Sequence, residues 1–276
     1  FRDVAGTWAQ EAFLEPSNGA AVGYAASNVG FSVTLNADGT TLAVGAPSGR
    51  NDASGDVFVF GRRTNFWTQD AALKAPVPSP GDAFGWSVSL DARGTGLAVG
   101  AVGSKAIDGM PSGAVYVFQK KDAWTADTSL KVSNTRDFFG TSVSLSANGT
   151  TLAIGAEGED SNAGAVYVFR STDTSWRQET RLEASRPNAL FGNRVSLSAN
   201  GSTLAAANWH DGVVYVYQRQ GMEWTVGETI MGVESRPHRA VSLGMSADGT
   251  LLAVGYQHQR QSADDLSAGT VRLVAR

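Results

Sequence analysis

Residues 139–169 contain three segments that decide the fold: Phe139-Gly-Thr-Ser-Val-Ser-Leu145, Thr151-Leu-Ala-Ile-Gly-Ala156 and Ala165-Val-Tyr-Val-Phe169. The first alternates polar and apolar residues with a period of two, which indicates a half-buried β-strand. It ends in Ser146-Ala-Asn-Gly149, a hairpin turn in which glycine adopts positive φ without steric cost. We therefore predict consecutive antiparallel strands joined by hairpins.

This unit occurs five times along the chain. Its turn glycines follow one another at intervals of 55, 55, 52 and 48 residues: Gly39, Gly94, Gly149, Gly201 and Gly249. Repeats of about this length are typical of propeller blades and solenoid coils. The second strand of each unit is made of small residues and the third of large ones, as wedge-shaped sheets around a common axis require. The sequence therefore predicts an all-β, five-bladed propeller of four-stranded antiparallel blades.

A tryptophan follows each third strand and marks a fourth, outer strand: Trp67, Trp124, Trp176 and Trp224. A fifth copy, Trp8, has no such strand before it, whereas the last unit ends at Arg276, directly after its third strand. We therefore predict one domain over residues 1–276, in which residues 1–17 complete the last blade. In this prediction the strand at about residues 7–14 closes the ring and Trp8 is buried, which removes an unpaired sheet edge.

Composition narrows the possible partners. The formal net charge is −4, from 22 basic and 26 acidic residues, so we expect neither nucleic acid nor an anionic membrane as partner. There are no cysteines, which excludes disulfides and thiolate metal sites. No apolar run approaches the ~20 residues of a transmembrane helix. The chain opens at Phe1 without methionine, which indicates a processed product or part of a longer chain.

The pair Phe139-Gly140 before the first strand and Ile154-Gly155-Ala156 at the end of the second resemble the FG-GAP repeat of integrin α-subunit propellers. Neighbouring units carry Phe84-Gly85, Phe191-Gly192 and the fuller Gly45-Ala46-Pro47. The motif weakens at Val29-Gly30 and in the fifth unit, where Ala240 stands without a Phe-Gly pair. The resemblance implies an extracellular or secreted protein, including the cell surface, with a role in binding or adhesion.

Many members of that family carry calcium in an Asp-rich loop between the first two strands. Calcium requires six to eight oxygen ligands, whereas the turns here, such as Asn36-Ala-Asp-Gly-Thr40, offer one or two. We therefore expect no metal or other cofactor. A second likeness, to WD40 units, is weaker because no Trp-Asp dipeptide ends the third strand.

Variable loops on a rigid scaffold are the usual place of recognition. The loops after the second strands differ in length and content, so we predict a ligand face there. The candidate residues form two sets, an aromatic patch and a ring of arginines: Trp209, His210, Asp211, Tyr256 and His258 for the patch, and Arg136, Arg186 and Arg236 for the ring. Trp209 can stack on a sugar or pack on the blade edge as Trp86 is expected to. The guanidinium groups can hold an anion or serve their own loops.

Acidic residues offer a further possibility. The stretch Glu157-Gly-Glu-Asp160, together with Asp264 and Asp265, can attract a cation or remain a solvated loop. Glycosidase chemistry needs two carboxylates in one cavity, and the predicted inner strands carry hydroxyl and aliphatic residues instead. We therefore predict that the chain is not an enzyme.

The predicted function is a recognition or adhesion module that binds a protein or glycan through the variable loops on one propeller face. The alternatives are a structural scaffold subunit docked in a larger assembly and, less favoured, a glycoside hydrolase that depends on Glu157, Glu159 or Asp160.

Overall fold

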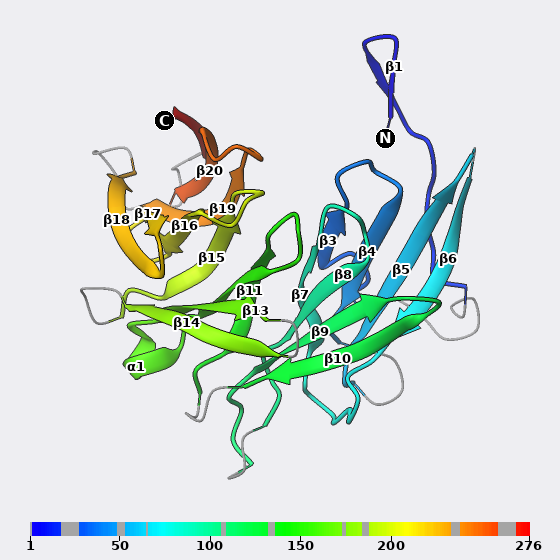
Figure 1. Cartoon of the computed structure of the whole chain (residues 1–276), viewed down its shortest axis with the longest axis horizontal. Helices are drawn as coiled ribbons and strands as arrows, with labels where there is room; N and C mark the ends of the chain where they lie inside the picture. Colours follow the sequence, from blue (N-terminus) through cyan, green and yellow to red (C-terminus); the bar gives the residue numbers. More distant parts are fainter. Residues whose placement is uncertain are drawn as a thin grey trace, which may run out of the picture.

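The structure is a computed structural model of the chain and describes residues 2–17, 28–48, 53–64, 66–105, 109–131, 136–172, 175–183, 188–232, 238–258 and 269–276. In these residues the protein is all-β, with five successive antiparallel sheets and one helix of 4 residues, α1 (Glu159–Asn162). Figure 1 shows the sheets side by side as the blades of a propeller. The predicted five-bladed propeller is confirmed.

The strands of each blade are hydrogen-bonded in sequence order. The first blade consists of β3 (Ser32–Leu35), β4 (Thr41–Ala46), β5 (Asp56–Arg63) and β6 (Phe66–Leu73). The second consists of β7 (Phe84–Leu90), β8 (Gly96–Ala101), β9 (Ala114–Lys120) and β10 (Trp124–Leu130). The third consists of β11 (Phe139–Leu145), β12 (Thr151–Ala156), β13 (Ala165–Ser171) and β14 (Trp176–Glu183).

The fourth blade consists of β15 (Phe191–Leu197), β16 (Thr203–Asn208), β17 (Val213–Gln220) and β18 (Glu223–Ile230). The fifth has three strands, β19 (His238–Met245), β20 (Leu251–His258) and β21 (Thr270–Ala275). A separate two-stranded sheet is formed by β1 (Arg2–Val4) and β2 (Thr7–Ala9).

Each Phe-Gly pair opens an innermost strand with a β-bulge. The pairing of β7 with β8 shifts register between Phe84 and Ser87. Gly85 lies in this bulge with φ +92°, and a Cβ there would come within 2.6 Å of the carbonyl oxygen of Asp56. Glycine is required for both reasons, the positive φ and the close backbone approach. The same bulge recurs in β11 and β15.

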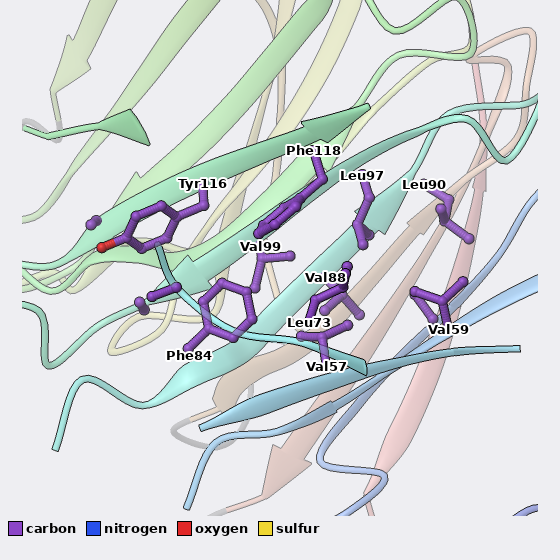
Figure 2. Packing of buried hydrophobic residues seen from close by; sticks show 14 residues of the cluster. Val57, Val59, Leu73, Phe84, Val88, Leu90, Leu97, Val99, Tyr116 and Phe118 are labelled. Carbon is purple, nitrogen blue, oxygen red and sulfur yellow. The ribbon is translucent and has the colours of Figure 1, made fainter. Parts of the chain in front are cut away.

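The hydrophobic core lies between neighbouring blades. Figure 2 shows the cluster between the first and second, where Phe84 lies near Val57 and Tyr116. The ring of Phe84 is fully buried and meets those of Tyr116 and Phe118 edge-on, with centroids 5.7 and 5.9 Å apart. The aromatic side chains of the third strand therefore fill the wider outer part of the space between blades, as the size gradient in the sequence predicts.

The prediction that residues 7–14 complete the last blade and close the ring is wrong. Thr7–Ala9 pairs with Arg2–Val4, while among the described strands β21 pairs only with β20, and Trp8 is 70% exposed. In Figure 1 the β1–β2 hairpin extends away from the blades, and the first and last blades lie at the two ends of an arc. A hairpin with a two-residue loop costs little chain entropy to form, and it takes the strand edge that β21 would need.

Within the described residues, no helix is long and apolar enough to cross a membrane.

Candidate functional site

A pocket of about 730 Å³ lies where the innermost strands of the blades converge. Its walls come from all five blades: Phe31, Ser32, Val33, Trp86, Ser87, Val88, Thr141, Ser142, Val143, Glu157, Leu190, Asn193, Arg194, Val195, Trp209 and Leu243. Glu157 and Trp209 directly follow β12 and β16, in the loops whose variation predicts a ligand face. We treat this axial pocket as the candidate site because pockets that combine apolar walls with a few polar groups are typical binding sites.

Aromatic rings form part of the wall. Phe31 and Trp86 occupy the same position in the first and second blades, directly after Gly30 and Gly85. Their ring centroids are 4.7 Å apart with planes tilted by 47°. Trp86 is half-buried and lines the pocket, so the expectation that it only packs beside its Phe-Gly pair is incomplete. Trp209 also lines the pocket, and the Arg239 guanidinium lies 4.0 Å from its ring centroid, a cation–π contact.

The third blade contributes a carboxyl group. Glu157 is half-buried, and its Oε1 accepts a hydrogen bond of 3.1 Å from the hydroxyl of Thr141. Burial raises the pKa of the Glu157 carboxyl, while the Thr141 hydrogen bond and the charge of Arg194 partly oppose the rise. Glu157 therefore keeps its proton to a higher pH than a solvated glutamate.

The fourth blade contributes a guanidinium and an amide. Arg194 donates from Nε to the carbonyl of Val241 at 2.9 Å and from Nη1 to the carbonyl of Asn193 at 2.7 Å. These bonds hold the guanidinium at the pocket, and its Nη2 has no partner among the described residues. Asn193 is 3% exposed; its Nδ2 donates to the carbonyl of Ala240 at 3.1 Å, and its Oδ1 has no hydrogen-bond partner in the described structure.

The structure separates the residues of the predicted aromatic patch. Trp209 lines the pocket, and His210 and Asp211 are exposed beside it in the tight turn before β17. That turn is held by Asn208, whose side-chain oxygen accepts the backbone N–H of His210 at 3.2 Å. Tyr256 is 2% exposed and belongs to the core between the fourth and fifth blades, so its ring does not extend the patch. His258 ends β20 opposite His238, and its side chain lies outside the description.

Of the predicted ring of arginines, only Arg136 lies among the described residues. Arg186 and Arg236 lie outside the described residues, as do Asp264 and Asp265. Arg136 is exposed, and its backbone N–H donates to the carbonyl of Pro111 at 2.6 Å.

The acidic stretch divides between two environments. Glu157 lines the axial pocket, but Glu159 is 1% exposed and accepts hydrogen bonds from the Tyr167 hydroxyl at 2.9 and 2.8 Å and from Arg181 Nε at 2.7 Å. Asp160 pairs with Arg181 at 2.6 Å. Glu159 is thus neutralised inside the blade and is not available to a ligand. Among the described residues, no three His, Asp or Glu side chains are grouped as a metal site requires.

Sequence reasoning did not single out Asn193 or Arg194 as pocket residues. A signal was present, because in the first four units the residue directly after the glycine before the first strand changes from blade to blade. That position holds Phe31, Trp86, Thr141 and Asn193. A position that varies inside an otherwise regular repeat points to the ligand face instead of the scaffold.

Comparison with known proteins supports the fold and the repeat. The FG-GAP repeat family model matches residues 67–118 and 131–169. No curated protein matches the chain. Among solved structures, hydrazine synthase of Kuenenia stuttgartiensis has a TM-score of 0.62 and 18% identity over 94% of this chain and 65% of its own. The periplasmic gluconolactonase of Pseudomonas aeruginosa has a TM-score of 0.57 and 19% identity over 82% of this chain and 65% of its own.

A protein from Lactobacillus plantarum is similarly related, with a TM-score of 0.60 and 14% identity over 89% of this chain and 70% of its own. This chain thus spans slightly less than two thirds of the first two structures, and at these identities the likeness establishes the fold alone.

One prediction has to be corrected on this ground. The prediction that the chain is not an enzyme is overturned, because hydrazine synthase and gluconolactonase are enzymes built on the same fold. The lack of paired carboxylates on the inner strands therefore does not exclude catalysis. The chain is therefore a β-propeller that contains FG-GAP repeats at residues 67–118 and 131–169.

Proposed function

We propose that this protein recognises carbohydrate and that its axial pocket binds a saccharide that carries a carboxylate. The observation that carries the proposal is the presence of Arg194, Asn193 and the Phe31–Trp86 pair in one pocket. Aromatic rings offer flat apolar faces with little conformational entropy to lose. Sugars present such faces together with hydroxyl groups that need hydrogen-bond partners.

Arg194 supplies the group that selects a carboxylate. Its guanidinium is a planar fork that matches the two oxygens of a carboxylate, and Nη2 is the nitrogen left over after Nε and Nη1 have bound backbone carbonyls. The bonds from Nε and Nη1 hold the guanidinium in place before a ligand arrives, so little side-chain entropy is lost on binding.

Asn193 supplies an acceptor for a sugar hydroxyl. A buried oxygen without a donor costs about 1–3 kcal/mol, and Oδ1 of Asn193 is in this situation in the described structure. Because this oxygen is buried beneath the pocket surface, a shift of the Asn193 side chain is needed before a ligand hydroxyl can bond to it and remove that cost. His210 and Asp211, exposed at the edge of the pocket beside Trp209, extend the same surface to a longer glycan.

We place this function outside the cytoplasm, in a secreted or surface-associated protein, since FG-GAP repeats are typical of extracellular and periplasmic proteins. A role in adhesion follows if the saccharide belongs to a cell surface or matrix.

The test is calorimetric titration with matched neutral and uronic-acid oligosaccharides. We expect the acidic set to bind, and we expect Arg194→Ala and Trp86→Ala each to weaken binding at least about tenfold, which is about 1.4 kcal/mol. Trp8→Ala is the matched control, because Trp8 is exposed on the β1–β2 hairpin. Equal binding of neutral and acidic sugars, or none of either, would contradict the proposal.

The same samples are analysed for shortened or ring-opened products. Their release would show that the pocket also performs chemistry on the saccharide, and Glu157→Gln is the variant to compare. Retention of a protein ligand by the Arg194→Ala and Trp86→Ala variants would instead place recognition on the loops around the pocket.

A further inference from the structure

The segment before the first blade occupies the position of a fourth strand. Leu14 follows Trp8 by six residues, as Leu73 follows Trp67. Leu73 belongs to the core between the first and second blades, and Leu14 packs against the cluster of the first blade that contains Phe58 and Phe60. Residues 10–17 therefore cover part of the face of the first blade that points away from the second.

An ion pair also shows that the N-terminal segment is equivalent to a fourth strand. In three places an acidic residue of a fourth strand pairs with a basic residue at the end of the third strand of the next blade: Asp70–Lys120 at 3.2 Å, Glu179–Arg219 at 2.6 Å and Glu228–Arg276 at 2.9 Å. Glu11 pairs with Arg62 of the first blade at 2.7 Å. The N-terminal segment thus contacts the first blade as the outer strand of a preceding blade would.

The residue that pairs with Trp8 across the hairpin shows to which blade the N-terminal segment corresponds. In the complete blades, the tryptophan of the fourth strand pairs with the residue two positions after the aromatic end of the third: Arg62↔Trp67, Lys120↔Trp124, Ser171↔Trp176 and Arg219↔Trp224. Asp3 pairs with Trp8 in this register, two positions after Phe1. Arg2–Val4 therefore stands where a third strand ends.

The last blade already has its own third strand. The pairing of β21 with β20 makes Ala275 equivalent to Gln218, so Arg276 is equivalent to Arg219. Asp3 and Arg276 thus stand at equivalent positions of two third strands, and only one of these can pair with a given fourth strand. Two third strands belong to two sheets, so the β1–β2 hairpin is not the missing edge of the fifth blade.

The face of the first blade that the inner strands of such an additional sheet would cover is exposed. Val33 and Leu35 are 63% and 55% exposed, whereas their counterparts Val88 and Leu90 are 9% and 7% exposed because the preceding blade covers them. Turn alanines link neighbouring blades, as in the bond from Ala37 N–H to the carbonyl of Ala92 at 3.2 Å. In the described chain, no donor reaches the carbonyl of Ala37.

We propose that β1 and β2 are the outer edge of a sixth blade and that the face around Val33 and Leu35 docks its inner strands. The occupant is a polypeptide of the same repeat type, with a small-residue second strand and a Val-x-Val third strand that leads into Phe1. The argument is continuity with an established interface, since the four interfaces between the described blades are built from the same positions. It does not depend on the proposed function.

A cross-strand disulfide tests whether β2 belongs with β1 or with β21. Arg2 and Ala9 are register partners, and the chain has no cysteine, so the double variant Arg2→Cys, Ala9→Cys forms one defined bond. We expect the oxidised and reduced forms to melt within about 2 °C of each other. A markedly lower melting temperature of the oxidised form alone would show that β2 leaves β1 to complete the last blade, and would overturn the proposal.

A gain-of-stability experiment supplies the second arm. The full chain is extended before Phe1 by a copy of its own residues 139–168, the inner strands of the third blade in matching phase. We expect the extension to raise the melting temperature by several degrees, and the double variant Val33→Asp, Leu35→Asp to abolish that rise. Val271→Asp, Leu273→Asp at the other end is the matched control, since those residues are 72% and 67% exposed.

Three further outcomes would overturn the proposal. One is an extended chain that melts like the original, and another is an equal loss of stability from Val33→Asp, Leu35→Asp with and without the extension. The third is concentration-dependent self-association of the original chain that the same double variant abolishes, because a second copy would then be the occupant of this face.

Discussion

The hydroxyl of Ser87 donates a hydrogen bond of 2.8 Å to the backbone carbonyl of Gly140, and so joins the inner strand of the second blade to that of the third. Ser32 makes the same bond to Gly85 one blade earlier. The inner-strand hydroxyls therefore hold neighbouring blades together at the axis. This structural role explains why a serine stands at this position in four of the five repeats, whereas the fourth has Arg194.

This contact leaves no room for a side chain at Gly100. A Cβ there would come within 2.1 Å of the Gly140 carbonyl oxygen, and that oxygen is backbone and cannot move aside. We expect Gly100→Ala to lower the free energy of unfolding by about 2–3 kcal/mol, as overpacked sites do. Chemical denaturation measures the change. Gly244→Ala is the control, since a Cβ at Gly244 meets nothing within 4 Å; a similar loss in both variants would contradict this account.

Two residues of the N-terminal segment should differ sharply in their contribution to stability. Leu14 packs on the aromatic side chains of the first blade, whereas Trp8 is 70% exposed. We expect Leu14→Ala to cost about 2 kcal/mol and Trp8→Ala less than about 0.5 kcal/mol. Thermal unfolding of both variants tests this, and a large loss from Trp8→Ala alone would show that the tryptophan is buried in solution.

The buried carboxylate of Glu159 in the third blade should contribute more to stability than the exposed carboxylate of Asp160. Glu159 is 1% exposed and bonded to both Tyr167 and Arg181. Glu159→Gln keeps the shape but removes the charge that compensates Arg181, so we expect a loss of about 2 kcal/mol. Asp160→Asn, with a side chain that is 65% exposed, should change stability by less than about 0.5 kcal/mol. Equal effects in urea denaturation would contradict this difference.

Binding of an acidic saccharide should depend on pH through Glu157. Burial raises the pKa of this carboxyl group, so it keeps its proton to a higher pH than a solvated glutamate, and its charge, which repels a ligand carboxylate, develops as the pH rises through that pKa. We expect affinity to increase from about pH 7 to about pH 5 and the increase to vanish in Glu157→Gln. Titration calorimetry at both pH values measures it; an unchanged slope in the variant would exclude Glu157 as the titrating group.

Only part of the pocket wall was indicated by the sequence. The sequence singled out Trp209 and Glu157, and both line the axial pocket. It missed Asn193 and gave Arg194 no role, because their importance depends on neighbours from other blades: Arg194 is held by Val241, and Asn193 by Ala240. The sequence also could not distinguish the environments of Glu157 and Glu159. These residues are only two positions apart, yet Glu157 lines the pocket and Glu159 is buried inside the blade.

What the sequence determined by itself is the blade: alternating strands, glycine turns and the Phe-Gly bulge recur because each is specified by residues close together in the chain. What only the tertiary structure decided is how blades meet. Trp8 has the sequence of a strand that closes a ring, yet its neighbours in space are Arg2–Val4 and not β21. Local patterns fix φ, ψ and the buried face of a strand, whereas the choice between competing edges depends on the free energies of pairing and loop closure between segments far apart in sequence.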